Sequence, residues 1–244
     1  MGRISSSPCS RLRTFRLVCQ PYERHAVESL LAAEGYVIEN EPYLDSARWV
    51  REEPKPLGSS LAASFGLLYI LDKSSMLPPL FLGPGLGTMV LDLCASPGSK
   101  TGILAELVGE KGLVVANEPK KKRYQTLRQN MQQLNLFQVV GTGYQAEAYP
   151  GLHLWDRILL DVPCSGWGTA EKNPKVLSVW REDNIRPLLI LQRHLLARAA
   201  ELLAPGGRLI YSTCTTNRQE NEDQILWAQA ELGLGLESLT AVPG

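Results

Sequence analysis

The sequence lacks an uninterrupted apolar run of membrane-spanning length, and its basic N-terminal stretch has no apolar core of signal-peptide length. It has only five cysteines and three histidines, with no CxxC pair and no histidines paired at metal-binding spacing. An odd number of scattered cysteines argues against a disulfide framework, and too few ligands lie together for a structural zinc site. We therefore expect a cytoplasmic protein with reduced thiols, no metal and no membrane contact.

A surplus of charge of either sign is also absent, because 25 Lys and Arg balance 25 Asp and Glu. Nucleic-acid-binding proteins often carry a basic surplus, so the neutral total counts against that class. The basic residues are nevertheless clustered, as arginines within residues 1–25 and as the run Lys120–Arg123. Such patches can bind phosphate groups, although a solvated surface explains each of them equally well.

The chain is predicted to hold a small N-terminal module and one larger domain. Residues 14–50 combine short strands with an amphipathic helix that follows Pro21 and ends at Gly35. Residues 51–60 are polar and rich in Pro, Gly and Ser, which is typical of a linker. We place the boundary so that residues 1–57 form a small α/β module with its linker and residues 58–244 form the larger domain.

From residue 86 onward, short apolar strands alternate with helices. The expected strands cover residues 88–94, 112–118, 137–143, 156–162 and 208–214. This alternation predicts an α/β fold with a doubly wound, parallel, Rossmann-like sheet covered on both faces. Such sheets bind ligands at the carboxyl ends of their strands, where Asp92, Glu118, Asp161 and Cys214 stand in this sequence.

A glycine turn follows the first strand of the larger domain, in VLDLCASPGSKTG. Gly98 lets backbone N–H groups approach a ligand at the start of the next helix. GxGxxG and GxxxxGKS are both absent, so neither a dinucleotide nor a nucleoside triphosphate is indicated. Glu118 stands roughly twenty residues past this turn, where an acid commonly binds ribose hydroxyls. A helix N-terminal acid favoured by the macrodipole is the competing explanation.

Cys164 and Cys214 are expected at the same edge of the sheet. Cys164 lies in a Pro/Ser/Gly turn after the fourth strand, and Cys214 ends the fifth. A single cysteine is more often a small buried hydrophobic residue. Two cysteines flanked by polar residues at strand ends could instead converge on a ligand without forming a disulfide.

The segments DLCASPGSKT, ANE, LLDVPCSGWGT and YSTCTTNRQENE, in this order, resemble the RNA (cytosine-5) methyltransferase family, also called the Nol1/Nop2/Sun family. YILDKSSMLPP resembles that family's entry segment, and residues 14–50 resemble the small N-terminal module of its bacterial ribosomal RNA members. The paired PC and TC cysteines are specific to the family among methyltransferases. The resemblance implies an S-adenosylmethionine-dependent methyltransferase domain with an RNA-binding N-terminal module.

The resemblance also implies catalytic roles. Cys214 matches the thiolate that attacks carbon 6 of cytosine, and Cys164 matches the cysteine that helps release the methylated product. Asp161 matches the acid that contacts N3 and the amino group of the base. Lys100 lies near both the cofactor and the base in family members and would orient the acid or the base.

Cofactor contacts are implied in the same way. The residues that match the loop around the methionine part are Cys94, Ala95, Pro97, Gly98 and Lys100. Glu118 matches the acid on the ribose, Arg123 a basic residue near the cofactor, and Asp161 borders the methyl group. Gln145 stands where the family has an acid on the adenine amino group, and its carbonyl could accept the same hydrogen bond. The loop reads CASPGSK where CAAPGGK is typical.

The expected partner is RNA with an unstacked target base, ribosomal RNA first and tRNA second, bound by a monomer. The chain ends at AVPG, where the family commonly continues, so we expect a truncation at the C-terminus. Three other functions stay open. A DNA cytosine methyltransferase would use Cys164 as nucleophile, a non-catalytic RNA-binding or assembly factor would keep only the fold, and a small-molecule methyltransferase would not need two cysteines.

Overall fold

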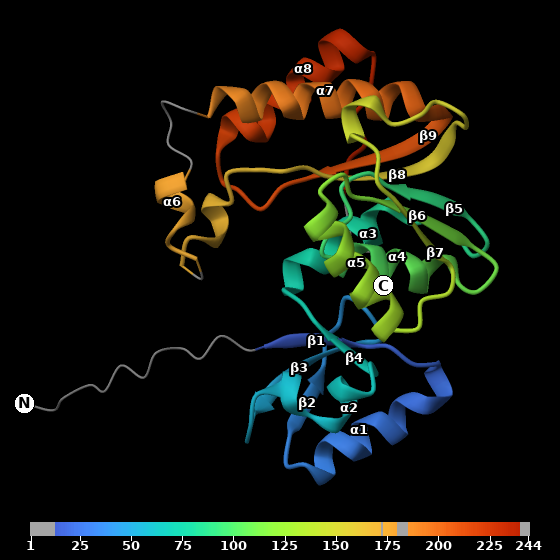
Figure 1. Cartoon of the computed structure of the whole chain (residues 1–244), viewed down its shortest axis with the longest axis vertical. Helices are drawn as coiled ribbons and strands as arrows, with labels where there is room; N and C mark the ends of the chain where they lie inside the picture. Colours follow the sequence, from blue (N-terminus) through green and yellow to red (C-terminus); the bar gives the residue numbers. More distant parts are fainter. Residues whose placement is uncertain (1–12, 172, 180–184, 240–244) are drawn as a thin grey trace, which may run out of the picture. The chain divides into compact units, whose positions relative to one another are not determined.

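The computed structural model describes residues 13–171, 173–179 and 185–239. The chain forms two compact units, the first ending at Ser75 and the second beginning at Met76 (Figure 1). The sequence placed this boundary between residues 57 and 58. It falls later because β4 (Leu68–Ile70) pairs with β1 (Thr14–Leu17) and so belongs to the first unit.

The first unit is built on an antiparallel sheet of four strands in the order β2-β3-β1-β4. Its remaining strands are β2 (Val37–Asn40) and β3 (Ala47–Glu52), and its α-helices are α1 (Arg24–Ala33) and α2 (Leu61–Ser64). Phe15 and Val50 project from the sheet into a core that also contains Leu31 of α1 and Ala62 of α2. One face of the sheet is therefore covered by the helices.

The second unit confirms the predicted parallel sheet. Five strands lie in the order β7-β6-β5-β8-β9, and every neighbouring pair is parallel. The strands are β5 (Met89–Asp92), β6 (Leu113–Asn117), β7 (Val139–Thr142), β8 (Trp155–Asp161) and β9 (Leu203–Ser212). The chain adds β6 and β7 on one side of β5 and β8 and β9 on the other. This reversal creates a switch point at the carboxyl ends of β5 and β8, where such sheets bind ligands.

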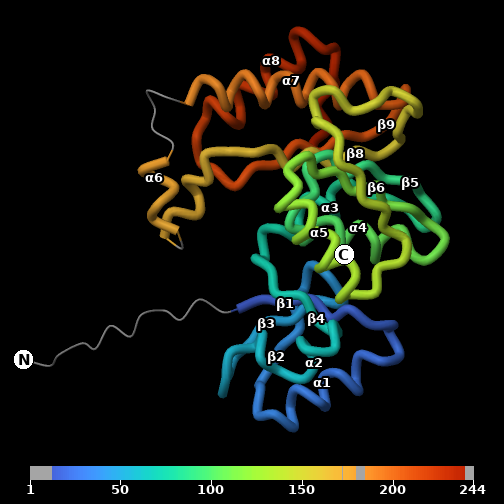
Figure 2. The backbone as a smooth tube through the Cα atoms, in the orientation of Figure 1, coloured from blue at the N-terminus to red at the C-terminus, as the bar shows by residue number. Residues whose placement is uncertain are grey.

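Helices cover both faces of this sheet (Figure 2). The helices of the second unit are α3 (Leu77–Leu82), α4 (Ser99–Val108), α5 (Lys121–Gln133), α6 (Val176–Val179), α7 (Arg186–Leu202) and α8 (Glu222–Leu232). Ile158 and Leu160 of β8 enter a core with α7, whereas Leu159 between them enters a second core with α3 and α4. Side chains that alternate along a strand therefore bury on opposite faces, which explains why these strands are apolar throughout.

The last strand begins earlier than the sequence suggested. β9 starts directly after α7, at Leu203, and contains Pro205 and Gly206, whereas the expected strand began at Arg208. Within the described sheet β9 is an edge strand, where a proline does not interrupt a ladder on both sides. Among the described residues, no helix combines the length and the hydropathy needed to cross a bilayer.

Candidate active site

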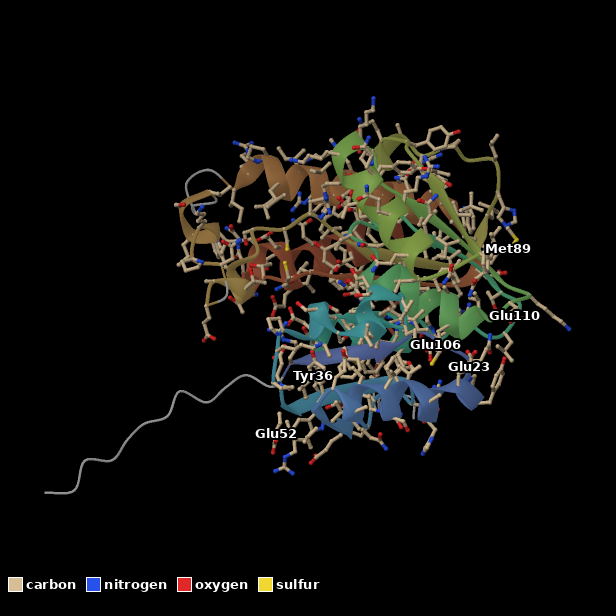
Figure 3. All side chains as sticks on the ribbon, turned by 60° about the horizontal axis from the view of Figure 1, so that its bottom comes forward. Glu23, Tyr36, Glu52, Met89, Glu106 and Glu110 are labelled. Carbon is tan, nitrogen blue, oxygen red and sulfur yellow. The ribbon has the colours of Figure 1, made fainter. Side chains whose placement is uncertain are left out.

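Polar side chains gather at the carboxyl edge of the parallel sheet. Asp92 is the last residue of β5 and Asp161 the last of β8, and these two strands pair directly. Met89 begins β5 at the opposite, amino edge and is labelled in Figure 3. The loops that carry the residues of interest therefore all leave from one edge, as the strand pattern predicted.

Two free thiols meet at this edge. The Sγ atoms of Cys164 and Cys214 are 3.0 Å apart, and the backbone N–H of Cys214 donates to Cys164 Sγ at 3.3 Å. The hydrogen bond from Cys164 lowers the pKa of Cys214 to about 7, although burial acts in the opposite direction. The same bond, followed by burial, raises the pKa of Cys164. The contact therefore favours the thiolate form at Cys214, which is the nucleophilic form of cysteine, and the protonated form at Cys164.

An ion pair lies beside the thiols. Lys100 Nζ is 2.6 Å from Asp161 Oδ2, and Ser212 Oγ donates to Asp161 Oδ1 at 2.6 Å. Lys100 stands in the first turn of α4, and its side chain is only 14% exposed. The charge of Lys100 lowers the pKa of Cys214 and that of Asp161 raises it, so both groups are close enough to influence the thiol.

The turn between β5 and α4 is tied to α5. Ser96 Oγ donates to the carbonyl of Arg123 at 3.0 Å, and Arg123 Nη2 donates to the carbonyl of Ser96 at 2.8 Å. Gly98 has φ +108°, and a Cβ there would lie 2.5 Å from Met131 Cε. The backbone conformation therefore favours glycine, and any side chain here would also have to displace the terminal methyl group of Met131. Ala95 is buried within this turn, and the side-chain amide of Asn130 donates to the carbonyl of Pro97 at 2.8 Å.

Cys94 differs from the other two cysteines of this edge. It packs against the core beside α7, and burial, reinforced by the acids nearby, raises its pKa. A thiol held neutral in this way is a structural rather than a reactive cysteine. Its expected place in the turn around the cofactor stays a prediction.

Glu118 follows β6 and is almost completely buried. Its Oε1 accepts from the backbone N–H of Lys120 at 2.9 Å, and its Oε2 lies 3.2 Å from Arg123 Nη1. Arg123 therefore offsets the buried charge and links it to the turn at Ser96. A carboxylate can accept about four hydrogen bonds, so Glu118 keeps capacity for a pair of hydroxyl groups.

Gln145 is separate from these contacts. It is exposed and precedes a short 3-10 turn (Ala146–Ala148), and within the described residues no hydrogen bond of its side chain is found. Among the described residues, no hydrogen bond therefore links its side chain to the other expected site residues, and its contact with the adenine stays a prediction.

Three polar residues of the site were not singled out from the sequence. Asn117, fully buried at the end of β6, donates to the carbonyls of Leu93 and Tyr144 and joins the loops after β5 and β7. Ser212 holds Asp161, and Glu220 is buried behind both cysteine loops. Asparagine is uncommon in strands, so Asn117 next to an apolar run was the available signal. No feature of the neighbouring sequence identifies Ser212 or Glu220 as a site residue.

The two expected basic patches differ in exposure. The run Lys120–Lys122 is exposed at the start of α5. In the N-terminal stretch, Arg13 and Arg24 form ion pairs with acids and Arg16 is buried. Arg3 and Arg11 lie outside the described residues. The arginines that the structure describes there therefore do not form an open basic surface.

Comparisons with known proteins agree with this geometry. Residues 79–231 match the family described as 16S rRNA methyltransferase RsmB/F. The chain is 38% identical over 228 residues to a ribosomal RNA small subunit methyltransferase F of Shewanella loihica, covering 88% of this chain and 47% of that protein. The protein of the same name from Shewanella amazonensis is 39% identical over 204 residues, covering 81% of this chain and 44% of that protein. A solved methyltransferase homolog from Pyrococcus horikoshii is 32% identical with a TM-score of 0.79, covering 90% of this chain and 70% of that one. The chain spans less than half the length of the two Shewanella relatives.

Proposed function

This chain belongs to the 16S rRNA methyltransferase RsmB/F family, and on that premise we propose that it methylates carbon 5 of a cytosine in RNA, with Cys214 as the nucleophile. The observation that carries the proposal is the contact between Cys164 and Cys214 beside the Lys100–Asp161 ion pair. S-adenosylmethionine, as the cofactor, supplies an electrophilic methyl group.

Cys214 overcomes the weak nucleophilicity of cytosine carbon 5. Its thiolate adds to carbon 6, so that an S–C6 bond forms and the ring electron pair moves to carbon 5, which then takes the methyl group. A thiolate suits this step because it is strongly nucleophilic and also leaves readily. The exposure of Cys214 allows a base to reach it.

Asp161 and Lys100 act on the base during this addition. The Asp161 carboxylate, fixed from both sides by Lys100 and Ser212, would contact N3 and the amino group of the cytosine and stabilise the shift of charge in the ring. A fixed carboxylate loses little freedom when the base binds, which favours the oriented complex.

Cys164 acts in the release step. Its pKa is raised chiefly by its bond to Cys214, and this effect ends when Cys214 is bonded to carbon 6. Cys164 then gives its proton to solvent water, and its thiolate takes the proton from carbon 5. The S–C6 bond breaks as the ring regains its double bond, and Cys214 leaves as a thiolate.

The residues at the ends of β5 and β6 fit the cofactor. The turn of Cys94, Ala95, Pro97 and Gly98 would surround the methionine part and Glu118 would accept from the ribose hydroxyls, with Arg123 bracing both. Gln145 would contact the adenine only after its exposed side chain turns inward. We therefore assign it the weakest part in binding.

The substrate class is RNA with an accessible, unstacked cytosine. Small-subunit ribosomal RNA is the first choice because both Shewanella relatives carry that substrate in their names, and tRNA is the second. The first unit would serve as an RNA-binding module, and the exposed Lys120–Lys122 would contact phosphates. We propose a monomer that acts in the cytoplasm.

Cys214 is exposed whereas Cys164 is only partly exposed, which favours Cys214 as the nucleophile over the DNA-type alternative, in which Cys164 would attack the base. The test is methyl transfer from labelled S-adenosylmethionine to unmodified small-subunit ribosomal RNA, tRNA and DNA in parallel, followed by nucleoside analysis. Label in 5-methylcytidine of one RNA, absent from a Cys214→Ala variant that still binds the cofactor, supports the proposal. Label in DNA, or intact cofactor binding with no label in any substrate, contradicts it.

A further inference from the structure

Glu220 is a fully buried carboxylate behind the two loops that carry Cys164 and Cys214. It is the last residue of a 3-10 turn (Arg218–Glu220) that precedes α8. The chemistry proposed above does not use it. Burying a carboxylate is costly unless hydrogen bonds satisfy it, so its contacts need an explanation.

The carboxylate holds the loop of Cys164. Its Oε2 accepts from the backbone N–H of Ser165 at 2.8 Å, and its Oε1 accepts from Ser165 Oγ at 2.5 Å. Gln192 of α7 donates both to Glu220 Oε2 at 2.9 Å and to the carbonyl of Pro163 at 3.0 Å. The residues on both sides of Cys164 are therefore fixed to one acid.

The same acid reaches the loop of Cys214. Asn217 Nδ2 donates to Glu220 Oε1 at 3.4 Å, and the hydroxyls of Ser165 and Thr215 are 2.8 Å apart. A Cβ on Gly168 would lie 2.8 Å from the carbonyl oxygen of Cys214. The two loops are thus in close contact at a second point, and only a residue without a side chain fits there.

We infer that Glu220 is a positioning residue that fixes the contact between the Cys164 and Cys214 sulfur atoms by joining residues 163–165 to residues 215–217. The inference rests on the proposed function, in which these thiols have separate tasks. A carboxylate suits the position because Ser165, Gln192 and Asn217 all donate to it. A glutamine would present an NH2 group to two of those donors and leave them unsatisfied.

Glu220→Gln tests this, with Glu222→Gln as the matched control. Glu222 undergoes the same chemical change two residues away on an exposed site. The measurement is the rate of alkylation of Cys214 by iodoacetamide as a function of pH, read by peptide mass mapping, without RNA or cofactor. The charged and titratable groups that face Cys214 are Cys164, Asp161 and Lys100, and Glu220→Gln changes none of them.

In Glu220→Gln, the midpoint of the Cys214 profile should move up by about one pH unit, because Cys214 loses the hydrogen bond from Cys164. The Glu222→Gln profile should superimpose on that of the wild type. A Glu220→Gln profile identical to the wild type overturns the inference, even when the variant is less stable or less active. That outcome would leave Glu220 a purely structural acid.

If Glu220→Gln does not fold, the same alkylation measurement on Ser165→Ala decides the question. It removes the hydroxyl that contacts both Glu220 and Thr215 but keeps the backbone bond, so a smaller upward shift is expected. An unchanged Ser165→Ala profile would then overturn the inference. Methyl transfer by the wild type is measured separately. Its absence contradicts the proposed function, whereas the alkylation profile still decides the role of Glu220.

Discussion

Replacing Asp92 with asparagine should stabilise the second unit, and the gain should be clearly larger above neutral pH than in mild acid. Asp92 ends β5 with 1% of its surface exposed, and Thr101 Oγ1 donates to its Oδ2 at 2.7 Å. Burial raises the pKa of Asp92 from 3.8 to about 7, with the hydrogen bond from Thr101 acting in the opposite direction. An asparagine oxygen can accept the same bond from Thr101 without carrying a charge.

The sign of this pH dependence follows from the number of protons that Asp92 binds in the folded and unfolded states. Between pH 3.8 and about 7 the folded state holds a proton on Asp92 that the unfolded chain has lost. The stability of the wild type therefore falls as pH rises through this window, and the loss is complete above the folded pKa. A displacement of roughly three pH units corresponds to about 4 kcal/mol, which is the largest gain that Asp92→Asn can show in alkaline solution.

The assay is urea unfolding of wild type and variant at about pH 5 and about pH 8, followed by a probe of the second unit. Asp156→Asn, at an exposed position near the start of β8, is the matched control and should give equal changes at both pH values. An advantage of Asp92→Asn that is the same at both pH values would refute the reasoning. It would mean that Asp92 is not held protonated by burial.

Four further changes test the site. Cys214→Ala should abolish methyl transfer and leave the cofactor dissociation constant unchanged, and turnover by this variant would contradict its role as nucleophile. Cys164→Ala should accumulate enzyme bonded to RNA, visible as a complex that survives denaturing electrophoresis; a complex that dissociates would argue against a role in release. Glu118→Ala should weaken cofactor binding by about 1–3 kcal/mol in calorimetry, since ribose hydroxyls would lose their acceptor, and equal affinity would mean that the ribose binds elsewhere. Gly98→Ala should lower the free energy of unfolding by about 1–3 kcal/mol, because its φ of +108° strains any side chain and the new Cβ meets Met131, and a neutral result would mean that this turn relaxes freely.

The parallel sheet could be predicted from the sequence because its signal is local. Each strand is a short apolar run that ends in a polar residue, and the helices between the strands begin and end at recognisable residues. The family assignment was likewise carried by short contiguous segments, and the match over residues 79–231 confirms it. These features depend on neighbours in the chain, which a sequence displays directly.

The antiparallel sheet of the first unit was only partly predictable. β4 is three residues long and pairs with β1, which lies more than fifty residues earlier in the chain. Its sequence carries no periodicity over so short a span, so the segment seemed to belong to the larger domain. The ion pairs of Arg13 and Arg24 could not be predicted for a related reason. A cluster of basic residues in the sequence does not show which acidic residues lie beside them in the fold.

The different pKa shifts of Cys164 and Cys214 are the feature of the site that the sequence is least able to predict. Cys164 and Cys214 stand fifty residues apart and have similar surroundings in the sequence, both at strand ends among small polar residues. The largest cause of the opposite shifts in their pKa values is the hydrogen bond between the two sulfur atoms, which lie 3.0 Å apart. The hydrogen bonds that join the two loops behind the sulfur atoms come from Ser165, Thr215 and Glu220, which are far from the thiols in the sequence or unremarkable beside them. If the inference about Glu220 holds, substitutions behind the loops will alter the reactivity of Cys214 without changing either cysteine, because they change how the two loops are joined.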